Sequence, residues 1–267
     1  MIKVAIVGAA GRMGQALVRA SRAAEGVALV SAVEIPANPW VGRDAGLAAG
    51  IGDIGVRIGA DTRAALMAAD VAIDFTFHTA APGNAALCAE LGKALVLGTT
   101  GLDAAESARV REVAAHVPVV WASNYSLGMN LLFSLVQQAA KALGPDYDIE
   151  IVEAHHHFKK DAPSGTALSL AKAAAAGRQQ ELDRVAVYGR HGITGERPRG
   201  EIGIHAIRGG DVVGDHTVLF AAAGERVELT HRASGREAFA PGAVLAARWV
   251  TGRAPGLYDM QDVLGLK

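Results

Sequence analysis

Mostly apolar runs of strand length alternate with helix-like stretches over the first 127 residues of the chain. The stretches between the runs are rich in Ala, and the first of them, 11–24, has helical spacing. The apolar runs occupy residues 2–8, 27–34, 71–76, 94–100 and 118–124. Apolar strands that alternate with helices are typical of a parallel sheet covered on both faces. The pattern predicts an α/β domain built on such a sheet.

The pattern changes after about residue 127. The run 148–156 begins a β-rich region, and 201–233 contains two Gly-containing breaks, at Gly209-Gly210 and at Gly224-Glu225. Breaks of this kind are typical of hairpins between consecutive strands. We therefore expect a smaller α+β domain with a largely antiparallel or mixed sheet. Residues 239–267 return to a helical pattern that fits either domain.

Composition narrows the class of protein. Of the 267 residues, 51% are hydrophobic, which excludes a disordered chain. The 26 Lys and Arg balance 27 Asp and Glu, so we expect no nucleic-acid or membrane partner. Cys88 is the single cysteine, which excludes a disulfide within the chain and a cysteine-rich zinc frame. The beginning of the chain has no signal-peptide layout, so we expect a cytoplasmic protein.

A glycine-rich turn follows the first apolar run. Gly8, Gly11 and Gly14 lie where the first strand should meet the first helix, in the spacing G-x-x-G-x-x-G rather than the usual G-x-G-x-x-G. Glycines let the backbone approach a pyrophosphate, and the helix N-terminus directs N–H groups at it. Glu34 ends the second run, where an acid can bind ribose hydroxyls. The alternatives are a turn that binds nothing and a solvated Glu34.

Small polar residues end two later runs. The stretches GTTG (98–101) and ASNYS (122–126) follow the runs at 94 and 118. Ligands of open parallel sheets bind beyond the carboxyl ends of the strands, so these residues suit the nicotinamide half of a dinucleotide. Helix capping by Thr99 or Ser123 is the alternative.

The stretch EAHHHFKKDAPSGTA, 153–167, concentrates titratable groups. Its three histidines are consecutive, and side chains on a strand alternate between faces, so we expect no metal site. Ser164 is a predicted N-cap, after which Gly165 and Thr166 would direct N–H groups at an anion such as a carboxylate. His155 and Lys159 could then serve proton transfer. A structural loop before a capped helix is the alternative.

Six motifs together resemble the bacterial 4-hydroxy-tetrahydrodipicolinate (dihydrodipicolinate) reductase family of the diaminopimelate route to lysine. They are GAAGRMG, DFT, GTTG, EAHHHFKKDAPSGTA, GERPRGEIGIHAIRGGDVVGDHTVLF and GLYDMQDVL, and the resemblance extends over nearly the whole chain. It implies a nicotinamide-dependent reductase of a small dicarboxylate. It also implies a Rossmann-like dinucleotide-binding domain over 1–127, completed by 236–267. Residues 128–235 would form a substrate-binding domain that assembles a homotetramer.

The resemblance also assigns roles residue by residue. His155 and Lys159 match the family's catalytic acid/base pair, and His156 matches a substrate-binding histidine. Gly165 and Thr166 match the pair that holds a substrate carboxylate. The cofactor-binding positions match Gly8, Ala9, Ala10, Gly11, Arg12, Met13, Glu34, Gly98, Thr99, Thr100, Ala122, Ser123, Asn124 and Tyr125.

One departure bears on cofactor choice. Some relatives carry an arginine after the ribose acid, where it can meet the 2′-phosphate of NADPH, but here Ile35 and Pro36 follow Glu34. We expect use of NADH and NADPH with a preference for NADH, although Arg12 could reach a 2′-phosphate. Two other functions remain open. One is a nicotinamide-dependent dehydrogenase of a small amino or imino acid, and the other is a dinucleotide-sensing regulatory module.

Overall fold

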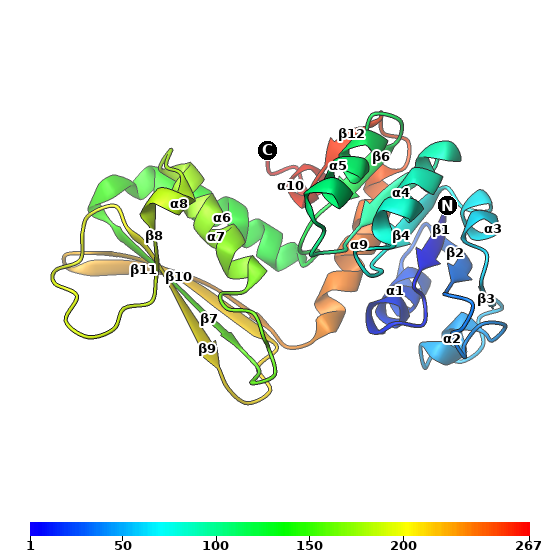
Figure 1. The fold of residues 1–267 in the computed structure, drawn as a ribbon, viewed down its shortest axis with the longest axis horizontal. Coiled ribbons are helices and arrows are strands. Elements are labelled where there is room, and N and C mark those ends of the chain that lie inside the picture. The colour runs from blue at the N-terminus through cyan, green and yellow to red at the C-terminus, as the bar shows by residue number, and fades with distance from the viewer. The chain divides into compact units, whose positions relative to one another are not determined.

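The chain forms two compact units (Figure 1). The computed structural model describes residues 1–267 except the Arg236 side chain. Unit 1 contains Met1–Leu127 and Glu237–Lys267, and unit 2 contains Gly128–Arg236. Among the described residues, no helix combines the length and the apolar character that a membrane crossing requires.

Unit 1 is built on a parallel sheet with the strand order β12-β6-β5-β4-β1-β2-β3. The strands are β1 (Ile2–Val7), β2 (Val27–Val33), β3 (Ile58–Gly59), β4 (Val71–Asp74), β5 (Ala94–Leu97), β6 (Pro118–Trp121) and β12 (Gly256–Tyr258). From β1 the chain runs outward to β3 and then returns to β4 on the other side of β1. This reversal is the point at which doubly wound sheets bind dinucleotides. The predicted Rossmann-like sheet is therefore confirmed.

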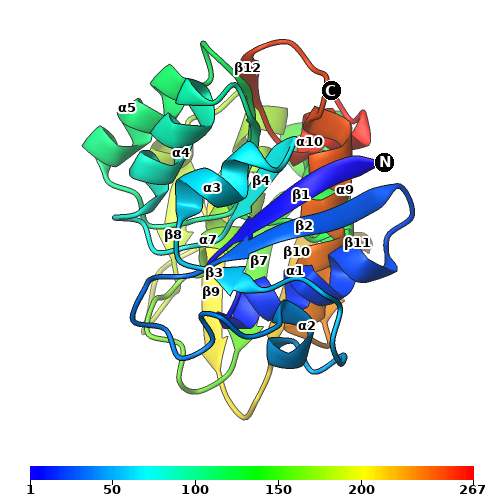
Figure 2. The ribbon, with the colours of Figure 1, turned by 90° about the vertical axis from the view of Figure 1, so that its right-hand side faces the viewer.

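Helices cover both faces of this sheet, as Figure 2 shows. Val4 and Ile6 face a core shared with α1 and α9, whereas Ala5 and Val7 face a core shared with α3, α4 and α5. The apolar runs were continuous because both faces of the strands are buried. The helices are α1 (Arg12–Ala23), α2 (Ala45–Ala48), α3 (Thr62–Met67), α4 (Ala81–Glu90), α5 (Ala104–Val113), α9 (Ala240–Val250) and α10 (Met260–Leu264).

Unit 2 contains a mixed sheet with the order β11-β10-β7-β9-β8. Side chains from α6 and α7 share one core with one face of this sheet. The strands are β7 (Asp148–His155), β8 (Ala186–Tyr188), β9 (Ile202–Arg208), β10 (Gly214–Ala222) and β11 (Glu225–Ala233). The helices are α6 (Leu127–Leu143), which begins in unit 1, α7 (Gly165–Gly177) and α8 (Leu182–Val185), with a 3₁₀ turn at Gly144–Asp146. A second 3₁₀ turn, Arg236–Phe239, begins in unit 2 and ends in unit 1. The expected second α+β domain with a mixed sheet is confirmed.

One of the two predicted hairpins is wrong. The break at Gly224 joins β10 and β11 as an antiparallel hairpin. The break at Gly209-Gly210 does not, because β7 lies between β9 and β10 and pairs with both of them. The connection 209–213 instead crosses the end of β7: the Gly209 N–H donates to the His155 carbonyl at 2.9 Å, and the His156 N–H donates to the Val212 carbonyl at 2.7 Å. The glycines thus serve a crossover that holds the backbone of the histidine stretch.

Candidate active site

The glycine turn of unit 1 forms a close contact between β1 and α1. Gly8 has a φ of +78°, and a Cβ on Gly14 would lie 2.1 Å from the Gly8 carbonyl oxygen. Gly11 is the N-cap of α1 and supplies no side-chain cap, so the first-turn N–H groups have no side-chain acceptor at that position. An uncapped helix start behind a turn that only glycine fits is a suitable site for a pyrophosphate. The six residues predicted to bind the cofactor, Gly8 to Met13, form this turn and the first two residues of α1.

Glu34 lies next to this turn. Its Oε1 accepts a hydrogen bond from the Ala10 N–H at 3.2 Å, and its Oε2 accepts one from the Ile35 N–H at 3.1 Å. The carboxylate is therefore held at the end of β2, beside the phosphate turn. This geometry suits hydrogen bonds to the ribose between a pyrophosphate and an adenine.

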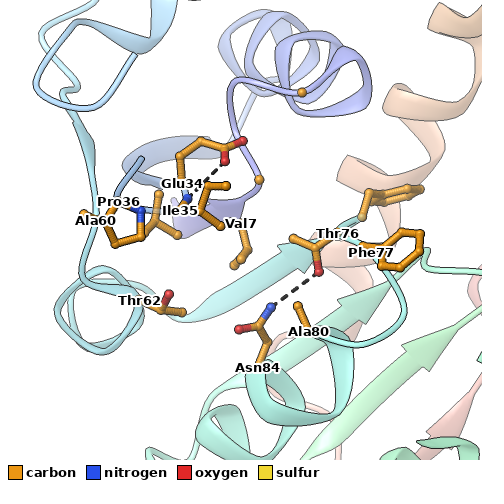
Figure 3. A pocket seen from close by; sticks show the side chains of 14 residues that line it. Val7, Glu34, Ile35, Pro36, Ala60, Thr62, Thr76, Phe77, Ala80 and Asn84 are labelled. Atoms are coloured by element: carbon orange, nitrogen blue, oxygen red, sulfur yellow. Dashed lines mark hydrogen bonds between the residues drawn. The ribbon is translucent and has the colours of Figure 1, made fainter. Parts of the chain in front are cut away.

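A pocket of about 380 Å³ opens beside Gly8, Gly11 and Glu34. Figure 3 shows Ile35, Pro36 and Ala60 on one side of it, and Phe77 and Ala80 on the other. The walls are mostly apolar and the lining residues include no Lys or Arg. A slot of this size between apolar walls, with a carboxylate at one end, fits the adenosine half of a nicotinamide dinucleotide.

Sequence reasoning missed Phe77 and Asn84, which line this pocket, and Asp74, which binds Asn84. Asp74 is fully buried at the end of β4 and accepts hydrogen bonds from the Thr76 N–H at 2.7 Å and from Asn84 Nδ2 at 2.8 Å. Burial raises the pKa of Asp74 above its ordinary value despite these bonds. Asn84 and the exposed ring of Phe77 both line the pocket. The DFT motif was a local signal for Asp74, whereas Asn84 comes from the following helix.

The later strand ends serve other contacts as well. Thr99 is buried and its Oγ1 donates to the Thr76 carbonyl at 3.0 Å. Tyr125 is buried, and its hydroxyl lies 3.0 Å from the carbonyl oxygens of both Leu97 and Val120. These two side chains join the ends of neighbouring strands. None of the residues 98–100 and 122–125 lines the pocket at Glu34, so their contact with a nicotinamide remains a prediction.

In unit 2, β7 presents a row of alternate side chains to the core. Ile149 and Ile151 are fully buried, Glu153 continues the row with no exposed surface, and His155 ends it with 11% of its side chain exposed. A carboxylate in a row of buried apolar residues needs partners to offset its desolvation. Glu153 has them on three elements.

Glu153 is the centre of a hydrogen-bonded cluster. Its Oε2 lies 2.6 Å from His155 Nδ1, and Arg208 of β9 donates to both carboxylate oxygens at 2.8 Å. Its Oε1 also accepts from the Ser164 N–H at 3.0 Å. Burial acts to raise the pKa of Glu153, but the bonds from Arg208, His155 and Ser164 outweigh it and hold the pKa below its ordinary value. The carboxylate is therefore ionised and joins His155 to the start of α7.

Lys159 belongs to the same cluster through Asp161. Its Nζ lies 3.0 Å from Asp161 Oδ1 and 2.9 Å from Oδ2, and Arg208 donates to the Asp161 carbonyl at 2.6 Å. The hydrogen bond from Lys159 lowers the pKa of Asp161. About a fifth of the Lys159 side chain is exposed. The structure thus brings both members of the predicted proton-transfer pair to one cluster.

The start of α7 completes the cluster. Ser164 is confirmed as the N-cap, since its Oγ accepts from the Ala167 N–H at 3.1 Å. The same Oγ lies 3.0 Å from Nε2 of His216, a buried residue of β10. Burial, with the nearby His155, lowers the pKa of His216 to about 4, so its ring is neutral near pH 7. Gly165 and Thr166 are the first two residues of the helix, where N–H groups have no acceptor within the helix.

The three consecutive histidines have different surroundings. His156 is half-buried, and its buried Nδ1 makes no hydrogen bond to the described residues. His157 is exposed, and its ring packs on Phe158. Among the described residues, no group of three His, Cys, Asp or Glu side chains could hold a metal ion. The residues that sequence reasoning missed here are Glu153, Arg208 and His216. Only Glu153 had a local signal, the spacing of two that places it on the same strand face as His155.

Two family models match this chain, one over each of its two parts. Residues 2–125 match the family described as "Dihydrodipicolinate reductase, N-terminus", and residues 128–264 match "Dihydrodipicolinate reductase, C-terminus". The 4-hydroxy-tetrahydrodipicolinate reductase of Alkalilimnicola ehrlichii is 56% identical over 99% of both chains. That of an Anaeromyxobacter species is 55% identical over 100% of this chain and 99% of its own.

A solved structure agrees with these matches. The dipicolinate-bound dihydrodipicolinate reductase of Paenisporosarcina sp. TG-14 is 25% identical, covers 98% of both chains and superimposes with a TM-score of 0.78. The protein is accordingly an oxidoreductase, and its Rossmann-like unit implies a nicotinamide cofactor. The chain belongs to the dihydrodipicolinate reductase family.

Proposed function

We propose that the protein reduces 4-hydroxy-tetrahydrodipicolinate to tetrahydrodipicolinate with NADH or NADPH, in the diaminopimelate route to lysine. The observation that carries this is the cluster of Glu153, His155 and Lys159 at the start of α7. It combines a helix N-terminus for a carboxylate with two groups that exchange protons. The relatives named as 4-hydroxy-tetrahydrodipicolinate reductases support the same substrate.

The residues of unit 2 have separate tasks in this reaction. Substrate and product differ by one hydroxyl group, so a hydride and a proton are taken up and one water is released. The bound cofactor supplies the hydride. The helix start at Gly165 and Thr166 orients a carboxylate of the substrate, with His156 beside it. His155 or Lys159 supplies the proton, and the Lys159 ammonium stabilises negative charge as the hydride arrives.

For the cofactor we propose dual use with a preference for NADH. The adenosine pocket contains the Glu34 carboxylate, which binds ribose hydroxyls and repels a 2′-phosphate. Ile35 is 67% exposed at the pocket and carries no charge that could attract that phosphate. Arg12 is exposed in the phosphate turn and is the cation available to NADPH.

Assembly as a homotetramer in the cytoplasm, through unit 2, is part of the same proposal. One face of the unit 2 sheet packs on helices, but the other leaves Val152 36% and Ile207 53% exposed. Exposed apolar side chains on a sheet are suited to contact with further copies of the chain. Light scattering of the purified protein measures the assembly: a mass near four chains supports it, and a monomer contradicts it.

The substrate distinguishes this function from a dehydrogenase of a small amino or imino acid. The substrate is generated in the cuvette by the aldolase that makes it, and the loss of NADH absorbance is followed. We expect a kcat/KM at least about ten-fold above that for simple imino acids, and competition by dipicolinate. Comparable rates on imino acids would favour the alternative dehydrogenase. Cofactor binding without turnover on any of these compounds would favour a sensing module.

A further inference from the structure

We infer that Glu153 is a positioning residue that fixes the His155 ring, so that Nδ1 donates to Glu153 and Nε2 is the atom at which the proton is exchanged with the substrate. This inference rests on the proposed function for the identity of the substrate. Its structural part concerns the ring alone and can be tested without turnover.

The contact distance supports this orientation. His155 Nδ1 lies 2.6 Å from Glu153 Oε2, and an ionised carboxylate only accepts hydrogen bonds, so Nδ1 carries the hydrogen. In the neutral ring, Nε2 is then the bare nitrogen and accepts a proton. A histidine whose other nitrogen donates to a carboxylate has its tautomer and orientation fixed in this way.

The opposite edge of the ring faces a glycine. A Cβ on Gly214 of β10 would lie 3.1 Å from His155 Nε2, a distance at which one of the two groups would have to move. The glycine therefore leaves room beside the nitrogen that exchanges the proton. His216, two residues further along β10, packs edge-on against His155 with its ring centre 5.2 Å away.

Arg208 determines how strongly Glu153 attracts the proton on His155. Its two hydrogen bonds at 2.8 Å pair the carboxylate with a full positive charge. The Arg208–Glu153 pair has a net charge close to zero. Glu153 can therefore orient the His155 ring without taking the hydrogen from Nδ1. The charged or titratable groups that act on His216, whose ring contacts His155, include Glu153, Lys159 and His231.

The contacts predict different effects of two substitutions on the tautomer of His155. Glu153→Gln replaces a carboxylate that only accepts with an amide that can accept or donate at Nδ1, so the ring should lose its single tautomer. Arg208→Gln leaves the carboxylate in place as the acceptor at Nδ1, so the Nδ1–H tautomer should remain. A merely structural role would disturb the ring in both variants alike.

The test is NMR of the full chain with ¹⁵N-labelled histidine. The chain has 9 histidines, and the signal lost in His155→Gln identifies the ring. Near neutral pH we expect wild-type His155 to carry its hydrogen on Nδ1, and Glu153→Gln to give a mixture of tautomers. A wild-type ring with the hydrogen on Nε2, or a Glu153→Gln ring that keeps the Nδ1–H tautomer alone, would overturn the inference. The wild-type measurement decides even if a variant fails to fold.

Glu150→Gln is the matched control. Glu150 lies on the other face of β7, 2.6 Å from His205 Nε2, and is also paired with arginines, Arg190 and Arg197. Its loss should leave the His155 signal unchanged. In reductase assays, Glu153→Gln should lower kcat by about 10²-fold with little change in cofactor KM. An inactive wild type with the expected tautomer would refute the proposed function and leave the role of Glu153 standing.

Discussion

The Gly8 carbonyl oxygen lies where a side chain on Gly14 would have to be, 2.1 Å from an added Cβ. Gly14→Ala must therefore push α1 away from the turn that we assign to the pyrophosphate. Overpacking of this kind costs about 1–3 kcal/mol. We expect a lower free energy of unfolding and a weaker Kd for NADH, measured by denaturant titration and by fluorescence.

Gly83→Ala is the control for that substitution. Gly83 lies near the start of α4, and a Cβ there would meet nothing within 4 Å. Alanine in a helix is favoured over glycine by about 0.5–1 kcal/mol, so this variant should be equally or more stable and bind NADH normally. Equal NADH affinity in both variants would contradict the assignment of the turn.

The cofactor preference should change with Ile35. Ile35→Arg places a cation at the pocket beside Glu34, where a charge-assisted contact is worth about 1.5–3 kcal/mol. The ratio of kcat/KM for NADPH to that for NADH should rise about ten-fold or more. Met67→Arg, at an exposed position of α3 that does not line the pocket, controls for added charge. An unchanged ratio would mean that residue 35 does not approach the ribose, and a ten-fold NADPH preference in the wild type would refute the NADH preference.

Lys159 and Lys160 form a matched pair. Lys159 pairs with Asp161 in the cluster, whereas Lys160 is exposed. Lys159→Ala should lower kcat by about 10²–10⁴-fold with little effect on NADH affinity, because the lysine acts at the substrate. Lys160→Ala should behave as the wild type. Steady-state kinetics with both substrates measures this, and near-normal turnover of Lys159→Ala would remove it from the mechanism.

The start of α7 can be tested with proline. Thr166→Pro removes one N–H from the second position of the helix, where proline is tolerated. We expect a raised KM for the substrate and an unchanged KM for NADH. Ala105→Pro makes the same change at the second position of α5 and should leave both constants unchanged. A folded Thr166→Pro enzyme with a normal substrate KM would contradict the carboxylate site.

His216 predicts a loss of stability in acid. Its pKa is about 4 in the folded chain, against about 6.5 in an unfolded one, so the unfolded state binds more protons between these values. Its contribution to the free energy of unfolding is present above pH 6.5 and is lost as the pH falls toward 4, by at most about 1.4 kcal/mol per pH unit. Urea titrations of the wild type and of His216→Gln at several pH values should show a shallower loss in the variant. Parallel curves would contradict the burial effect.

Local patterns in the sequence were sufficient to predict the parallel sheet of unit 1 and the turn that follows its first strand. The turn at Gly8 and the acid at Glu34 are each specified within a few residues by strand ends and helix starts, which the structure retains. The walls of the pocket were not predictable in the same way. Ile35 follows β2 and Phe77 follows β4. Both line one pocket because β2 and β4 lie on either side of β1 in the sheet.

Unit 2 was less predictable because its site depends on distant pairing. Arg208 lies 55 positions after Glu153 and reaches it because β9 pairs with β7. The Gly209-Gly210 break has the same composition as a hairpin turn, and only the central position of β7 makes it a crossover. The contact between Glu153 and His155 could have been predicted, because residues two apart on a strand lie on the same face. Sequence reasoning overlooked it.

Transfer of deuterium tests the central claim most directly. The enzyme is supplied with NADH deuterated at the hydride-donating carbon and with 4-hydroxy-tetrahydrodipicolinate made in place by the aldolase. The account predicts that the tetrahydrodipicolinate formed carries the cofactor's deuterium in a one-to-one ratio to NADH oxidised, and that Lys159→Ala slows this transfer but Lys160→Ala does not. NADH that binds but leaves no deuterium in the product would contradict the account.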